Sequence, residues 1–317
     1  MPLRKFLPHI YPIDIITFAY IIITGVYIII GAVALENIGS HLLMRLILIG
    51  AIVLLIFLNF SIHNKGIHFL RSFYPLAFLG YFYPETDYLN NIIFPNLDPA
   101  LSNLEVTIFG GQPSIWFSHY IPWKWFNDLM NLSYFSFYIF IFILCYWIYN
   151  YQRRHFQETI FIVCMSFYMY YILFIVFPVV GPQFFFSPPD NQLPDAYFFR
   201  DLIKFVGIYG ERPTGAFPSS HVGIMLILAY LAYKYAPKLL KWMIPGGILL
   251  IFSTVYIKAH YVIDVIAGFL SVPTMYWISK QAFQLLTHGI SHEAHTFTLY
   301  EKLSTAIKQL RSKTMKK

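Results

Sequence analysis

Two short motifs in the C-terminal half of the chain contain residues that can act as acids, bases or nucleophiles. They are PSSH at 218–221 and HYVID at 260–264. His260 and Asp264 are four positions apart, so on a helix they share one face and the carboxylate can accept a hydrogen bond from Nδ1 of the imidazole. That bond would set the tautomer and leave Nε2 free as a base or a nucleophile.

The first motif has the composition of a helix start that binds an anion. Pro218 fits the first turn of a helix, and Ser219 or Ser220 can cap it. The free amides and the positive dipole end of such a helix bind phosphate. We therefore expect His221 to lie in that first turn, beside the group that the amides hold.

Other interpretations of the same residues remain open. A single histidine such as His221 at a helix end is usually an interfacial polar residue, and His221, His260 and Asp264 have the chemistry of metal ligands. We nevertheless expect no metal and no other cofactor, because no further Cys, His or Asp cluster lies nearby on the same side. A serine protease is a weaker match, since Ser220 and His221 are adjacent. Asp264 is the most informative residue, because a charge inside a membrane is costly and is kept for a partner or a reaction.

The composition identifies the kind of protein that positions these residues. Of 317 residues, 58% are hydrophobic and 12% are charged, which is too few charges for a soluble globule of this size. A membrane span needs about 20 apolar residues. The sequence therefore predicts an all-α, polytopic bundle of transmembrane helices with about eight spans. The predicted spans are 14–35, 40–62, 67–83, 130–150, 156–178, 219–236, 238–258 and 260–281.

The third predicted span is the weakest of the eight. It is short and contains Arg71 and Pro75. The alternative is a bundle of six or seven spans with a re-entrant or interfacial helix at 67–83.

The distribution of Lys and Arg orients the bundle, because cytoplasmic loops retain positive charge. With the N-terminus inside, sixteen of the 22 Lys and Arg residues fall on the cytoplasmic side. Both termini are then cytoplasmic, and both histidine motifs face the outer, periplasmic or lumenal, side. The net charge of +7 is assigned to membrane electrostatics, so we expect no nucleic-acid partner. The high content of Ile, Phe, Tyr and Lys hints at a bacterial inner membrane.

Four regions follow from this topology. They are the N-terminal transmembrane helices (1–83), an outer interfacial segment (84–129), a catalytic transmembrane core with an outer loop at 179–217 (130–282), and a basic cytoplasmic tail (283–317). Three tryptophans in the second region favour the headgroup level of the bilayer. In the tail, apolar residues recur at helical spacing, so a basic amphipathic helix and a solvated disordered tail are both open.

The two histidine motifs resemble signature motifs of the type 2 phosphatidic acid phosphatase superfamily. PSSH at 218–221 and Ser-x6-His-x3-Asp at 253–264 are similar to its second and third motifs, Pro-Ser-Gly-His and Ser-Arg-x5-His-x3-Asp. The longer strings at 215–221 and 253–264, and loosely the segment 98–113, look closer to its inositol phosphorylceramide synthase branch. The resemblance covers roughly residues 95–272 and implies a six-helix catalytic core.

This resemblance implies a phosphohistidine mechanism without a metal. His260, held by Asp264, would attack phosphorus, and His221 would protonate the leaving alkoxide and then deprotonate the acceptor. Ser219, Ser220 and nearby amides would bind the phosphate oxygens, since phosphoryl transfer depends mainly on positioning and charge stabilisation.

The chain departs from the superfamily pattern at the phosphate-binding cations. Thr254 stands where the phosphatases have Arg, and the first motif, Lys-x6-Arg-Pro, is absent because Lys204 and Arg212 are one residue out of register. We expect Lys258 first and Arg212 second to supply the positive charge, with Arg200 and Lys204 as further candidates. Fewer cations disfavour a phosphomonoester substrate, whose dianion needs more positive charge than a diester.

Three functions fit these residues. The favoured one is transfer of a phospho-headgroup, such as inositol phosphate from phosphatidylinositol, to the hydroxyl of a ceramide-like or diglyceride-like lipid. The second is hydrolysis of a lipid phosphate or pyrophosphate, with water as the acceptor. The third is a channel, transporter or scaffold without catalysis, in which changes at His260 and Asp264 would leave lipid composition unaltered.

Overall fold

The computed structural model describes residues 9–31, 35, 37–62, 64–199, 201 and 212–314, with side chains as far as residue 288. Every regular element of this part of the chain is a helix, which confirms the predicted all-α class. The helices are α1 (Pro12–Ile30), α2 (Ile38–Ser61), α3 (Lys65–Leu89), α4 (Asp98–Phe109), α5 (Pro113–Tyr120), α6 (Lys124–Tyr151), α7 (Arg153–Val176), α8 (Pro182–Phe185), α10 (Ser220–Tyr235), α11 (Pro237–Tyr256) and α12 (Val262–Thr314).

Six of the described helices are long and apolar enough to cross a membrane, namely α1, α2, α6, α7, α11 and α12 as far as His288. The 28 residues of α6 extend about 42 Å at ~1.5 Å per residue, more than the ~30 Å hydrocarbon core of a bilayer. Large apolar side chains cover the outside of the bundle, and Leu46 and Leu270 are 67% and 73% exposed. The chain is therefore an integral, multi-pass membrane protein.

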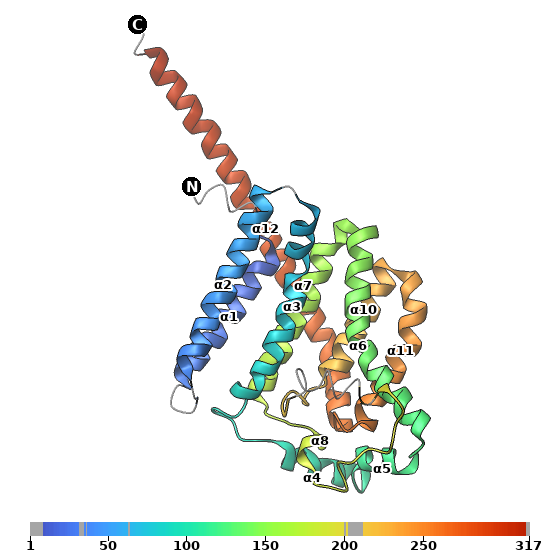
Figure 1. Cartoon of the computed structure of the whole chain (residues 1–317). Coiled ribbons are helices and arrows are strands. Elements are labelled where there is room, and N and C mark those ends of the chain that lie inside the picture. Colours follow the sequence, from blue (N-terminus) through green and yellow to red (C-terminus); the bar gives the residue numbers. More distant parts are fainter. Residues whose placement is uncertain are drawn as a thin grey trace.

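The helices run up and down in one bundle, and α4, α5 and α8 lie across one end of it (Figure 1). At the other end of the bundle, away from α4, α5 and α8, α1 begins and α12 extends out of the bundle (Figure 1). α3 corresponds to the third predicted span, and its 25 residues pack along α7 despite Pro75 and Pro84. The structure thus shows a continuous helix at this position, but α3 is not one of the six described helices that are long and apolar enough to cross a membrane. It continues beyond residue 83, the predicted end of the first region.

The helix α10 is the centre of the bundle. Its 16 residues span only about 24 Å, and it packs against α6, α7, α11 and α12. Most of its side chains are apolar and buried, whereas Tyr230 and Tyr233 near its end are 44% and 67% exposed. The first turn of this helix contains His221.

Two ion pairs hold the N-terminal helices together within the bundle. Arg45 of α2 contacts Glu85 of α3 at 2.8 Å, and Arg71 of α3 contacts Asp14 of α1. All four side chains are buried. A charge removed from water is costly unless it is paired, so the position of each of these residues depends on its partner.

A glycine allows the start of α10 to lie directly against α12. A Cβ atom added at Gly268 would be only 2.6 Å from the carbonyl oxygen of Ser219. At the same contact the amide of Ser219 donates to the carbonyl of Asp264 at 3.0 Å. The two sequence motifs are therefore in contact through their backbones. The tail predicted at 283–317 continues α12 as far as Thr314, and its side chains beyond residue 288 lie outside the described residues.

Candidate active site

The serine cap at the start of α10 is built as the sequence predicts, whereas Pro218 lies before the cap and not in the first turn. Ser219 is the N-cap residue, and its Oγ accepts a hydrogen bond from the amide of Val222 at 3.4 Å. His221 consequently lies in the first turn, next to the free amides and the positive end of the helix dipole.

The two predicted histidines contact one another. Nδ1 of His221 lies 3.1 Å from Nε2 of His260, which belongs to the turn between α11 and α12. Lys258, in the same turn, has a left-handed backbone conformation with φ of 65°, and this conformation helps to reverse the chain. The fold thus brings together two side chains that are 39 positions apart.

A backbone carbonyl determines the tautomer of His260. Nδ1 of His260 is 2.7 Å from the carbonyl oxygen of Ala216. A carbonyl oxygen can only accept, so Nδ1 carries the hydrogen and Nε2 carries a lone pair. The proton between the two rings therefore belongs to Nδ1 of His221, which donates to Nε2 of His260.

The predicted hydrogen bond from His260 to Asp264 is wrong. The two side chains approach to 3.6 Å between Nδ1 and Oδ2, but Oδ2 accepts the amide of Tyr261 at 2.8 Å. The physical reason is that α12 begins at Val262. His260 precedes the helix, so the helical i, i+4 geometry does not apply to this pair. Asp264 still places a fully buried carboxylate beside the imidazole.

Burial keeps His260 uncharged. It lowers the pKa of His260 to about 4, although the hydrogen bond to Ala216 acts in the opposite direction. At neutral pH the ring is therefore a neutral imidazole. A neutral ring with its hydrogen on Nδ1 is the form in which Nε2 can act as a nucleophile.

The histidine pair lies inside the helix bundle. The ring of His221 is 4.6 Å from the ring centroids of both Tyr134 and Phe137 of α6. Tyr134 is ten residues after Lys124, the first residue of α6, or about 15 Å along the helix. Substrate must therefore reach a site inside the bundle.

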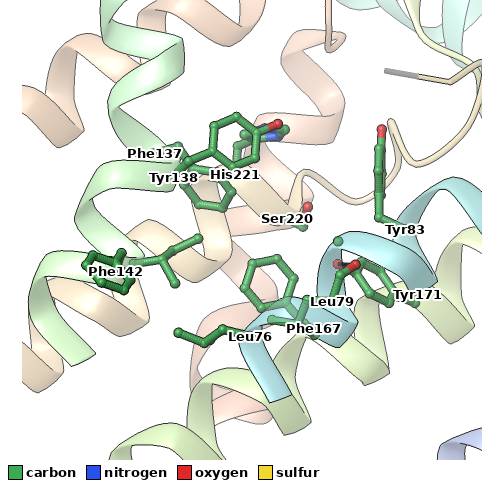
Figure 2. A pocket seen from close by; sticks show the side chains of 12 residues that line it. Leu76, Leu79, Tyr83, Phe137, Tyr138, Phe142, Phe167, Tyr171, Ser220 and His221 are labelled. Atoms are coloured by element: carbon green, nitrogen blue, oxygen red, sulfur yellow. Dashed lines mark hydrogen bonds between the residues drawn. The ribbon is translucent and has the colours of Figure 1, made fainter. Parts of the chain in front are cut away.

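An apolar cavity of about 280 Å³ adjoins His221. Figure 2 shows its walls, in which Tyr83 and Phe142 lie on opposite sides. The lining residues come from α3, α6, α7 and α10, and they are Leu76, Leu79, Gly80, Tyr83, Phe137, Tyr138, Ile141, Phe142, Phe167, Tyr171, Ser220 and His221. Nε2 of His221 is buried and has no hydrogen-bond partner among the described residues. A buried polar atom without a partner at a cavity wall is a site for a ligand atom.

Two acidic residues of α4 hold the loops around His260. Asp98 accepts the amides of Val180 and Gly181 at 2.7 and 2.9 Å and the hydroxyl of Tyr261 at 3.1 Å. Glu105 accepts the amide of Val262 at the start of α12. Burial raises the pKa of Glu105 to about 7, although these amide hydrogen bonds favour the charged form. Both residues lie in the segment 98–113, which resembles the family only loosely. The sequence therefore predicted no function for either of them.

The predicted phosphate-binding cations differ in their surroundings. The ammonium group of Lys258 is buried and donates to Oγ of Ser118 at 2.8 Å and to the carbonyl of Gln192. Burial lowers the pKa of Lys258 to about 8. The structure therefore orients this cation toward α5 and the loop at 179–217, which weakens its predicted role at the phosphate.

Arg212 retains the features of a phosphate-binding residue. It interacts electrostatically with Asp87 of α3, and its Nε is buried without a hydrogen-bond partner in the described part of the chain. It lies a few residues before Ala216, whose carbonyl contacts His260, and before Ser219, the cap of α10. Arg200 and Lys204 lie outside the described residues. No group of three His, Cys, Asp or Glu side chains suited to a metal ion occurs among the residues described.

Comparisons with known proteins cover this part of the chain. Residues 107–278 match a family model described as PAP2 superfamily. A PA-phosphatase related-family protein of Dictyostelium discoideum is 24% identical over 164 residues, which cover 45% of this chain and 30% of that protein. The chain thus spans less than a third of that relative's length, and no solved structure matches. The match includes both histidine motifs, begins within α4 and leaves α1, α2 and α3 outside.

Proposed function

Because the chain belongs to the PAP2 superfamily, we propose that it is a membrane-embedded lipid phosphotransferase that works through a phosphohistidine intermediate. Membership indicates a lipid phosphatase or phosphotransferase, and the finer assignment is our inference. The observation that carries it is the contact between Nδ1 of His221 and Nε2 of His260 beside an apolar cavity. The first atom can donate a proton and the second can attack phosphorus.

In the first step, the lone pair on Nε2 of His260 forms a bond to phosphorus. The bond from phosphorus to the leaving oxygen breaks, and that oxygen takes the electron pair together with the proton on Nδ1 of His221, which acts as the imidazolium with a second hydrogen on Nε2 and is left as a neutral ring. A separation of 3.1 Å between these nitrogens leaves no room for phosphorus, so substrate binding must move the rings apart. The carboxylate of Asp264, 3.6 Å from Nδ1 of His260, would stabilise the positive charge that the ring acquires.

In the second step, Nδ1 of His221 removes the proton from the acceptor hydroxyl. The acceptor oxygen attacks phosphorus, the bond from phosphorus to Nε2 of His260 breaks, and its electron pair returns to the ring. The carbonyl of Ala216 holds the hydrogen on Nδ1 throughout. The same two nitrogens thus serve both half-reactions.

The start of α10 is the proposed binding site for the phosphate oxygens. Its free amides, with Ser219 and Ser220, provide donors and the positive end of a helix dipole. Arg212 is the cation that we assign to the phosphate, because its Nε is buried without a partner in the described chain. Lys258 is the weaker candidate, since Ser118 and Gln192 already engage its ammonium group.

The cavity supports a lipid hydroxyl as the acceptor. Its walls are almost wholly apolar and it adjoins His221, so it suits the hydrocarbon chain of a ceramide-like or diglyceride-like lipid. The resemblance to the inositol phosphorylceramide synthases makes phosphatidylinositol the favoured donor. One observation favours the second candidate, a lipid phosphate phosphatase: the name of the Dictyostelium relative refers to PA-phosphatase.

The test separates the two acceptors. Protein purified in detergent is incubated with phosphatidylinositol labelled in the inositol phosphate, with and without ceramide, and lipid products are separated from water-soluble ones. A new labelled phospholipid that requires ceramide, and that is absent with His260→Ala, supports the transferase. If a labelled water-soluble phosphate compound forms equally without ceramide, water is the acceptor and the protein is a phosphatase instead. No product from any donor, phosphatidic acid included, would refute both.

A further inference from the structure

A second cavity lies at the other end of the bundle from the histidine pair. Its volume is about 830 Å³, and it is bounded by the end of α2, the start of α3, the end of α6 and the start of α7. These ends lie opposite the layer formed by α4, α5 and α8 (Figure 1). Because the helices cross a membrane, this cavity is at the bilayer surface remote from the proposed reaction.

The lining of this cavity is basic. It includes Lys65, His68 and Arg153 together with three asparagines, and it includes no Asp or Glu. Neither Lys65 nor Arg153 takes part in an ion pair among the described residues. The cavity therefore concentrates positive charge that the described protein does not neutralise.

The guanidinium of Arg153 is held in place before any ligand binds. It lies 4.6 Å from the ring centroid of Tyr149. One of its amino groups is 3.1 Å from Nε2 of His68, whose Nδ1 is 3.2 Å from the hydroxyls of Tyr149 and Ser72. Positioning a cation in advance reduces the entropy lost when an anion binds.

The cavity also has an apolar side. Phe69 and Tyr146 contribute to its wall next to the basic residues, and Tyr146 is 47% exposed on the outside of the bundle. Aromatic side chains beside cations at the ends of membrane helices are typical of the lipid headgroup region. A ligand that is anionic at one end and apolar at the other fits this wall better than free phosphate does.

We propose that this cavity binds the phosphate headgroup of an anionic lipid from the leaflet opposite the histidine pair. Arg153 and Lys65 would contact the phosphate oxygens, with amide donors from Asn59 and Asn150. The bound lipid would connect α2 and α3, which lie outside the family match, to α6 and α7, which lie inside it. This binding is independent of the proposed reaction.

The test measures lipid binding to the His260→Ala chain, in which the proposed turnover is absent. Native mass spectrometry in detergent compares phosphatidylglycerol with phosphatidylcholine of the same acyl chains. We expect a phosphatidylglycerol adduct whose affinity falls about tenfold with Arg153→Gln and also with Lys65→Gln. Lys241→Gln is the matched control, because Lys241 is an exposed cation outside this cavity, near the start of α11.

Three results would overturn the proposal. One is equal phosphatidylglycerol binding by all of these variants, and another is equal binding of the two lipids. The third is binding of inorganic phosphate alone with the same dependence on Arg153 and no lipid adduct, which would make free phosphate the ligand. Arg153→Gln and Lys65→Gln lie on different helices. If size-exclusion chromatography shows that one of them misfolds, the other still tests the proposal.

Discussion

Nδ1 of His221 and Nε2 of His260 lie 3.1 Å apart, with the only hydrogen between them on His221. That proton is assigned because the other ring nitrogen of His260 donates to the carbonyl of Ala216 at 2.7 Å. Each ring therefore has a distinct task before substrate arrives. His260 presents a lone pair, and His221 presents a hydrogen.

The first prediction concerns the covalent intermediate. His260→Ala should abolish turnover and all labelling of the protein by a donor labelled on phosphorus. His221→Ala should still become labelled slowly when the leaving group is good, because such a group departs without a proton. The measurement is label retained on the denatured protein under alkaline conditions. Label on the His260→Ala protein would exclude His260 as the nucleophile.

The second prediction concerns the pH dependence of the same step. In the His221→Ala chain with a good leaving group, only the protonation of His260 controls the labelling rate. Because burial lowers the pKa of His260 to about 4, the rate should be constant from neutral pH down to about 5 and should fall as the pH approaches 4. Single-turnover labelling across this range measures it. A midpoint near the ordinary value of about 6.5 would contradict the assigned electrostatics.

The third prediction concerns Asp264. Asp264→Asn removes the charge beside Nδ1 of His260 but keeps an oxygen that can accept the amide of Tyr261. We expect turnover to fall about tenfold or more, which corresponds to a loss of about 1.4 kcal/mol of transition-state stabilisation. Size-exclusion elution and thermal unfolding should remain close to those of the unaltered protein. Aggregation of this variant would instead assign Asp264 a structural role.

The fourth prediction tests the cavity as the site of an apolar chain. Gly80 lines the cavity, and a Cβ atom added there meets nothing within 4 Å, so Gly80→Leu should fill the space without disturbing a neighbour. Turnover of long-chain lipid should fall, while turnover of a short-chain water-soluble phosphoester should not. Gly50→Leu on α2, where an added Cβ is equally free of contacts, is the control. Equal losses on both substrates would show that the cavity does not select for the chain.

The fifth prediction concerns Glu105 and the stability of the protein. Burial raises the pKa of Glu105 from 4.5 to about 7, so between these values the folded state binds a proton that the unfolded state releases. Stability from this group is therefore fully present below pH 4.5 and is lost as the pH rises toward 7. Glu105→Gln should make thermal unfolding in detergent less dependent on pH in this window. Parallel curves for the two proteins would refute the assignment.

Local patterns in the sequence predicted the long helices and much of the site, but not the short helices α4, α5 and α8. Runs of apolar residues predict the long helices, because each span must bury its own backbone polar groups and so must be continuous. Ser219 as the cap of α10, and His221 in its first turn, follow from residue types next to one another in the chain. The two motifs also indicate which side chains share a site.

The tertiary structure alone decided how those side chains are oriented. His260 and Asp264 do not share a helix face, because α12 begins only at Val262, and a carbonyl 44 positions away from His260 takes the expected hydrogen bond. Lys258 points to Ser118 because the turn after α11 reverses the chain. The apolar cavity beside His221 depends on α3 and α6 meeting beside α10. The spacing of residues in the sequence predicts which side chains are neighbours within one helix. The contacts of His260, of Lys258 and around the cavity depend instead on where each helix ends and on which distant segments pack against it.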